Sequence, residues 1–273
     1  MTGQATPIPT PPATVPPPPG NTAAALTLAG MKADILEAHE EALASLLTGN
    51  SEETEGFIAS MDHFDTGAAT FAGEADLTRP DHSQEYAGLQ AILMMKDAYQ
   101  MSVNDILDIS RSGGTVDRES LKNMEDQFDD LSNEMDWFYR DYSSRVAADS
   151  GSAGDRAAVR LTDAKNAMLA GSGDLYGYLL TGDSGKKQDF IISPGEIDDA
   201  LAVPGPDLIT ASGADQVSLD ELRGGIAAFE STGNALAESY EREGSVNRTG
   251  LDQFGTAVDR LNTMFDGLIR SVR

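Results

Sequence analysis

The sequence has no cysteine, few basic residues and no long hydrophobic run. Without cysteine, the 273-residue chain cannot form disulfides, use a thiol as a nucleophile or bind a metal through thiolates. The chain has 19 Lys and Arg residues against 45 Asp and Glu residues, which gives a formal charge of −26. This charge argues against nucleic acid as a partner, because nucleic-acid binding depends on Lys and Arg side chains that neutralise phosphate. No segment reaches the roughly 18 consecutive apolar residues expected of a membrane span, so none is predicted.

Proline is abundant only at the start of the chain. Eight of the 12 prolines lie between residues 7 and 19. Proline lacks a backbone donor and fixes φ, so residues 1–22 are predicted to be a disordered, extended tether. Met1–Pro12 (MTGQATPIPTPP) resembles the mature start of an exported lipoprotein. The resemblance implies an extracytoplasmic location and a lipid anchor at the native N-terminus, on a Cys in the place of Met1.

The rest of the sequence repeats itself, at an interval of nearly half the chain. Leu46–Asn50 (LLTGN) recurs as Leu179–Asp183 (LLTGD). Gly114–Arg118 (GTVDR) recurs as Gly244–Arg248 (GSVNR), at a slightly shorter interval. A deletion of three residues between the two matches reconciles the intervals. We therefore predict two tandem units, residues 23–149 and 150–273, related by internal duplication.

The last segment of each unit has the clearest helical pattern. Its apolar residues alternate steps of three and four, which is typical of helices that pack at shallow angles in a bundle. These positions are Leu121, Met124, Phe128, Leu131, Met135, Phe138 and Tyr142 in the first unit, and Leu251, Phe254, Val258, Leu261, Phe265, Leu268 and Val272 in the second. Asp117 and Asn247 are suitable N-caps for them. Further helices are predicted at about 24–49, 51–77, 89–106, 154–182 and 219–240, so the expected fold is all-α, with two tandem four-helix bundles.

The second helix of the second unit departs from the pattern of the first unit. Ser193–Glu196 (SPGE) has the signature of a helix start with Pro in the first turn, so a short helix is expected to begin there and to end by Val203. A loop of about 12 residues should follow from Pro204. Asp149–Asp155 (DSGSAGD) is the predicted junction between the units.

No pattern of catalytic or metal-binding residues stands out. His39, His63 and His82 all lie in the first unit, none belongs to the Glu-x-x-His pair of a di-iron bundle, and surface or capping roles are expected for them. Acidic clusters such as Glu52–Glu55 are expected to be solvated helix faces, although weak surface binding of divalent cations stays open. The nucleophile motif Gly-x-Ser-x-Gly does not occur. We predict a protein that is not an enzyme and has no catalytic residue, cofactor or metal.

Four residues are candidates for contact with a ligand or a partner. Lys96 interrupts the apolar seam of the helix at 89–106. Gly233 lies within the seam of the helix at 219–240, where it would allow either a close helix approach or a small cavity. Trp137, the one tryptophan, and Tyr139 lie off the seam of their helix and should face the neighbouring unit or a partner.

Gly177–Asp183 (GYLLTGD), followed by Phe190, resembles a stretch in extracytoplasmic sensor domains of histidine kinases and chemotaxis receptors. Those domains carry it where one long helix gives way to the next. It covers only a short part of each unit, and no membrane span, kinase region or methyl-accepting hairpin accompanies it. The resemblance implies four-helix bundles of sensor type. It transfers no ligand residue, because the stretch marks a helix junction.

These features predict an envelope-exposed, surface-tethered protein that binds a small molecule or another envelope protein. The alternative is a structural or adhesive spacer, in which the bundles only set a distance. A binder should have a cavity between helices with converging polar groups. A spacer should have closed cores, with any apolar patch on the outside.

Overall fold

The computed structural model describes residues 21–146, 152–202 and 216–272, and in these ranges the chain forms eight α-helices and one 3-10 helix. They are α1 (Thr22–Thr48), α2 (Ser51–Glu74), η1 (Pro80–His82), α3 (Ser83–Arg111), α4 (Arg118–Ser144), α5 (Ala153–Thr181), α6 (Ser184–Ala202), α8 (Gln216–Glu243) and α9 (Arg248–Val272). The predicted all-α fold is confirmed. The proline-rich segment, the first three residues of the predicted junction (149–151) and the loop expected after α6 lie outside the described ranges. Within those ranges, no helix combines the length and apolar character needed to cross a membrane.

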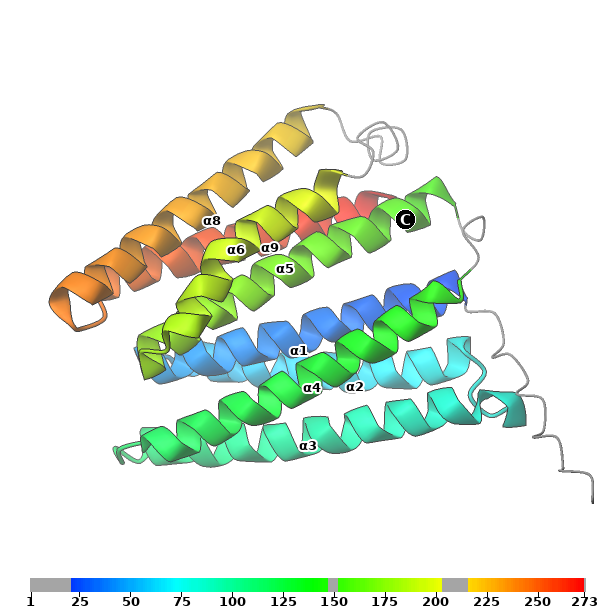
Figure 1. The fold of residues 1–273 in the computed structure, drawn as a ribbon, viewed down its shortest axis with the longest axis horizontal. Helices are drawn as coiled ribbons and strands as arrows, with labels where there is room; N and C mark the ends of the chain where they lie inside the picture. Colours follow the sequence, from blue (N-terminus) through cyan, green and yellow to red (C-terminus); the bar gives the residue numbers. More distant parts are fainter. Residues whose placement is uncertain (1–20, 147–151, 203–215, 273) are drawn as a thin grey trace, which may run out of the picture.

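The first helices of the two units, α1 and α5, lie side by side in the centre of the molecule and run in the same direction (Figure 1). α1 also packs against α2, α3 and α4, and α5 packs in the same way against α6, α8 and α9. Both helices are buried around most of their circumference. A helix that is apolar on all sides must be covered on all sides. The two four-helix units therefore share one continuous hydrophobic core.

The last helices, α4 and α9, bury one face each. All seven seam positions of α9 are buried, and so are six of the seven in α4, where Leu121 is half-buried. Both helices begin at the predicted caps: Asp117 accepts a hydrogen bond from the Ser120 N–H (2.8 Å), and Asn247 accepts one from the Gly250 N–H (3.2 Å). The seams and the caps predicted from the sequence are confirmed.

The junction after the first helix has the same geometry in both units. Gly49 and Gly182 adopt left-handed conformations (φ 69° and 73°), which glycine reaches without a steric penalty. The N–H of each glycine donates to the carbonyl four residues earlier, at 2.8 and 2.7 Å. The threonine before each glycine donates its hydroxyl to a carbonyl in the last turn, at 2.8 and 2.7 Å. An internal duplication would leave this shared geometry, and the duplication itself stays a prediction from the sequence repeat.

The prediction that a helix restarts at Ser193 is wrong. α6 runs without interruption from Ser184 to Ala202, with Pro194 inside it. Proline has no N–H for the carbonyl of Phe190, four residues earlier. The Ser193 hydroxyl donates to that carbonyl instead (2.9 Å), and Phe190 and Ile197 bury both halves of the helix against the core. The Ser193-Pro194 pair thus lies inside one helix, whereas the sequence pattern predicts that a new helix begins there.

Candidate functional site

A half-open cavity of about 500 Å³ lies between the two units. α1 and α4 of the first unit and α5 and α6 of the second all contribute side chains to its wall. We call this space the inter-unit groove. Its lining residues are Lys32, Leu36, Ser132, Asp136, Tyr139, Arg140, Asp163, Asn166, Ala167, Ala170, Glu196 and Ala200. Its volume lies within the range of small-molecule sites, whereas its lining is more polar than is usual for them.

Several charged and polar side chains in the inter-unit groove form ion pairs or hydrogen bonds with one another. The Lys32 ammonium lies 2.5 Å from the Asp136 carboxylate. The Tyr139 hydroxyl donates to Asp163 at 3.2 Å, across the boundary between the units. Burial raises the pKa of Asp163 above its ordinary value, although the hydrogen bond from Tyr139 and the positive charge of Arg160 act in the opposite direction. Burial likewise raises the pKa of Tyr139, so the phenol keeps its proton and acts as the donor.

Asn166, one of the residues that line the inter-unit groove, has a buried acceptor without a hydrogen-bond partner. Its side chain is 3% exposed, and its Nδ2 donates to the carbonyl of Ala29 on α1 at 3.4 Å. Because a carbonyl can only accept, the NH₂ group must face Ala29, which fixes Oδ1 as the other end of the amide. Oδ1 is buried and has no hydrogen-bond partner. A buried, unpaired acceptor costs about 1–3 kcal/mol, so its presence calls for an explanation.

Side chains bridge the equivalent space on the other side of α1 and α5. Lys165 and Asp266, which match Lys32 and Asp136 in the repeat, form the same pair at 2.8 Å. Glu37, however, takes the place of Ala170. It crosses that space to accept a hydrogen bond from Asn262 (2.9 Å) and lies 3.7 Å from Lys165. The repeat therefore places an alanine where the groove is open and a glutamate where the equivalent space is bridged.

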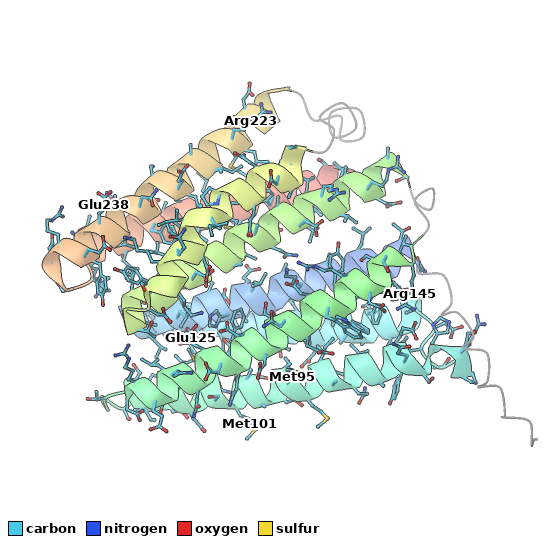
Figure 2. All side chains as sticks on the ribbon, in the orientation of Figure 1. Met95, Met101, Glu125, Arg145, Arg223 and Glu238 are labelled. Atoms are coloured by element: carbon cyan, nitrogen blue, oxygen red, sulfur yellow. The ribbon has the colours of Figure 1, made fainter. Side chains whose placement is uncertain are left out.

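A second polar cluster lies inside the core where the units meet. His39 shares a hydrogen bond with the Tyr99 hydroxyl (2.9 Å) and stacks on Phe128 with 3.5 Å between ring centres. Its Nε2 lies 3.8 Å from the carboxylate of Glu125. Figure 2 labels Glu125 on α4, which belongs to the first unit, and its partner at 2.5 Å is Lys186 of the second unit. His39, Tyr99, Phe128 and Glu125 are buried, and the ion pair with the partly exposed Lys186 links the two units.

Two of the three histidines differ from the expectation of surface or capping roles, whereas His63 is exposed on α2 as expected. His39 and His82 are both buried. Burial, and to a lesser degree the charge of Lys186, lowers the pKa of His39, so the ring is neutral and packs as an aromatic core residue. Within the described part of the chain, no group of three or more His, Asp or Glu side chains is arranged to hold a metal ion.

The structure places the four predicted contact residues differently from one another. Tyr139 lies in the inter-unit groove and faces the neighbouring unit. Trp137 is 54% exposed on the outside of α4. Lys96 is buried, and its ammonium binds Asp65 at 2.9 Å and a second carboxylate at 3.0 Å. Gly233 allows a close approach: a Cβ there would overlap the ring of Phe190.

Three important groove residues did not stand out in the sequence: Lys32, Asp163 and Asn166. In a chain with 45 acids, polar residues on a helix look like a solvated face. One signal was available, because the pair Lys32–Asp136 recurs as Lys165–Asp266 at the two intervals of the sequence repeat.

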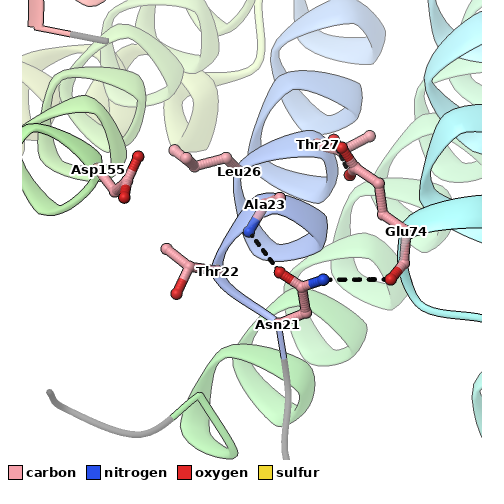
Figure 3. Close-up of a pocket in the computed structure, with 7 residues that line it drawn as sticks. All are labelled: Asn21, Thr22, Ala23, Leu26, Thr27, Glu74 and Asp155. Carbon is pink, nitrogen blue, oxygen red and sulfur yellow. Dashed lines mark hydrogen bonds between the residues drawn. The ribbon is translucent and has the colours of Figure 1, made fainter. Parts of the chain in front are cut away.

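A second cavity, of about 550 Å³, lies at the start of α1 (Figure 3). Asn21 caps the helix there by accepting a hydrogen bond from the Ala23 N–H (2.9 Å) and donating to the Glu74 carbonyl (3.2 Å). Thr27 donates to the Glu74 carboxylate at 2.6 Å. These polar groups close the end of the bundle and are already engaged with one another. The inter-unit groove is therefore the stronger candidate site.

No protein-family model, curated protein or solved structure matches this chain. The functional argument therefore depends on the chemistry of the inter-unit groove.

Proposed function

We propose that this chain is a non-enzymatic binding protein that holds a small polar molecule in the inter-unit groove. The observation that carries the proposal is the inter-unit groove itself, a space of about 500 Å³ that is lined by four helices and mostly by polar and charged side chains. A space of this volume can hold a small molecule, and its polar lining favours a polar one.

The position of the groove supports a sensor-like role. Its wall comes from both units, so a bound molecule would contact both and favour one relative arrangement of them. In this proposal the proline-rich segment tethers the units to the outside of the cell, as the resemblance to exported lipoproteins suggests. The ligand signal then passes to an envelope partner through the outer helices.

Binding can be tested by thermal-shift screening of amines, amino acids, organic acids, polyols and divalent cations. A ligand at 100 times its Kd adds about 2.7 kcal/mol, which for a chain of this size raises Tm by roughly 5–10 °C. The matched variants are Ala170→Leu, which fills the inter-unit groove, and Ala91→Leu, which adds the same atoms at an exposed position of α3. We expect a stabilising compound to act on the parent chain and on Ala91→Leu, and to lose its effect on Ala170→Leu.

Two results would count against the proposal: no compound stabilises the parent chain at millimolar concentration, or a stabilising compound acts equally on Ala170→Leu.

The second candidate function, a spacer or adhesive protein, is favoured by the exposed methionines of α3. Met94 and Met101 are 74% and 68% exposed, and they are seven residues apart on one face of the helix. Such a face suits a protein partner. A chain with this role would show no stabilisation in the screen.

A further inference from the structure

Helix α3 carries a second row of apolar residues, on the side opposite its buried seam. The buried seam, which begins at Leu89, packs against the core. The residues of the second row recur in steps of four and three, and they are Ala87, Ala91, Met94, Ala98 and Met101. All five are exposed, and Figure 2 shows Met101 pointing away from the bundle at its outer edge. We call these five residues the outer row of α3.

The spacing of the outer row is that of a coiled-coil seam. Alternating steps of four and three place its residues at positions a and d over two heptads, and a helix with such a row packs against another helix. Residues 87–101 span about 21 Å, or about four helical turns. The alanines leave hollows between the methionines, where large side chains of a facing helix can insert, and methionine adapts to the shape of a partner.

The equivalent helix of the second unit lacks such a row. Both α3 and α8 are outer helices, at opposite edges of the molecule (Figure 1). In the sequence repeat, Gly224 and Ser231 of α8 stand at the positions of Met94 and Met101. Both are exposed, and neither has a large apolar side chain. An outer helix of this architecture therefore folds without an apolar outer row, so the packing of the bundle does not account for the row on α3.

The surroundings of the outer row are acidic. Asp97 flanks the row, and Asp105 and Asp108 continue it toward the end of α3, where all three are exposed. Two cations offset part of this charge: Lys96 lies 3.0 Å from Asp97, and Arg111 lies 3.7 Å from Asp108. The row is thus an apolar strip with a net negative border.

The charge of the whole first unit has the same sign. Residues 23–149 contain 26 of the 45 acidic residues of the chain and only 8 of its 19 basic residues. A second copy of the chain on the outer row would bring two such units together, and their repulsion opposes self-association. A helix with Lys and Arg beside its own apolar row would instead be attracted.

We infer that the outer row of α3 is the docking surface for an amphipathic helix of a partner protein, with apolar residues at heptad spacing and Lys or Arg on both flanks. The apolar contact supplies affinity, and the basic flanks select the partner. The inter-unit groove is lined by residues of α1, α4, α5 and α6, so the docking surface is separate from it and functions whether or not the groove holds a ligand.

The test uses the full chain and three synthetic peptides of about 15 residues, the length of the outer row. The first has Leu at positions a and d and Lys or Arg at the flanking positions. The second contains the same residues in an order without heptad spacing, and the third has Glu in place of each Lys and Arg. Fluorescence anisotropy of labelled peptides measures binding. We expect the first peptide to bind, and the other two to bind at least about tenfold more weakly.

Two double variants separate the outer row from the overall charge. Met94→Glu/Met101→Glu removes both large apolar side chains and makes the chain more negative. Binding of the first peptide through charge alone would therefore strengthen, whereas binding on the row should weaken by about tenfold or more. Gly224→Glu/Ser231→Glu adds the same two charges at the equivalent positions of α8 and should change the affinity by less than about twofold. All four positions are exposed, so both variants should fold, which circular dichroism checks.

Three binding results overturn the inference: the first peptide does not bind at millimolar concentration, the second binds as tightly as the first, or Met94→Glu/Met101→Glu binds the first as tightly as the parent chain does. Sedimentation equilibrium tests the other occupant. We expect the parent chain to be a monomer. A dimer that dissociates in Met94→Glu/Met101→Glu would assign the outer row to a second copy of the chain and overturn the choice of partner.

Discussion

Replacing Glu41 by Gln tests whether carboxyl groups on α1 hold protons at neutral pH. The Glu41 carboxylate accepts a hydrogen bond from Ser60 at 3.0 Å. Burial and the neighbouring charge of Glu37 raise its pKa to about 8. Glutamine has the same shape and keeps an acceptor for Ser60, so the substitution removes the charge and little else.

The size and sign of the effect follow from proton linkage. A rise in pKa from 4.5 to about 8 corresponds to an upper limit of about 5 kcal/mol, which solvent screening of this partly exposed side chain reduces to about 1–2 kcal/mol. Because the folded pKa is raised, the stability that Glu41 contributes is fully present below about pH 4.5 and is lost as the pH rises through about 8. Glu41→Gln should therefore raise the free energy of unfolding by about 1–2 kcal/mol near pH 9, and by less than about 0.5 kcal/mol near pH 5.

Urea unfolding, followed by circular dichroism at both pH values, measures the difference. Glu55→Gln is the control, because Glu55 is exposed on α2 and its replacement should change the stability by less than about 0.5 kcal/mol at either pH. The reasoning is refuted if Glu41→Gln destabilises the chain near pH 9, or if its effect is the same at both pH values.

Three further predictions concern the packing of the helices, and urea unfolding measures each. Ser193→Ala should cost about 1–3 kcal/mol, because the carbonyl freed by the proline in α6 loses its donor; an unchanged stability would show that the hydroxyl is dispensable. Gly233→Ala should cost about 1–3 kcal/mol through overlap with core aromatic rings, whereas Gly224→Ala, with open space around it, should gain up to about 1 kcal/mol; equal effects would contradict this. Lys186→Met should cost about 3 kcal/mol or more by leaving Glu125 buried and unpaired, and adding Glu125→Leu should recover most of the loss. A double variant as unstable as the single one would refute that account.

The helices that pack with one face could be predicted from the sequence, and those that pack on all sides could be predicted only in part. The apolar residues of α9 recur in steps of three and four, so the buried face of this helix can be predicted from its own sequence. α1 is apolar around much of its circumference, which indicates a central helix but does not say which helix covers each side. Its contact with α5 depends on the whole arrangement of helices. For the same reason, the shared core could not be derived from either repeat taken separately.

Of the residues that line the inter-unit groove, Tyr139 was predicted from the sequence as a contact residue, and the others were not. Tyr139 stood out because it is an aromatic residue off the seam. Asn166 and Asp163 are polar residues on a helix, and the neighbouring unit buries the first and half-buries the second. The error at Ser193-Pro194 has a local origin: the same residues that favour a helix start can also continue a helix when the serine hydroxyl replaces the missing backbone donor.

The parallel packing of α1 on α5 has a consequence for how the two sides of the molecule can differ. Two identical chains joined through the same helix would form an isologous dimer, in which a two-fold axis makes every surface feature occur twice. In such a dimer, any residue that opens one groove opens the other, and any residue that bridges one bridges both. A single chain is free of this constraint, because the positions of Ala170 and Glu37 are encoded separately. Covalent linkage thus permits a groove on one side of the central helix pair and bridging side chains on the other.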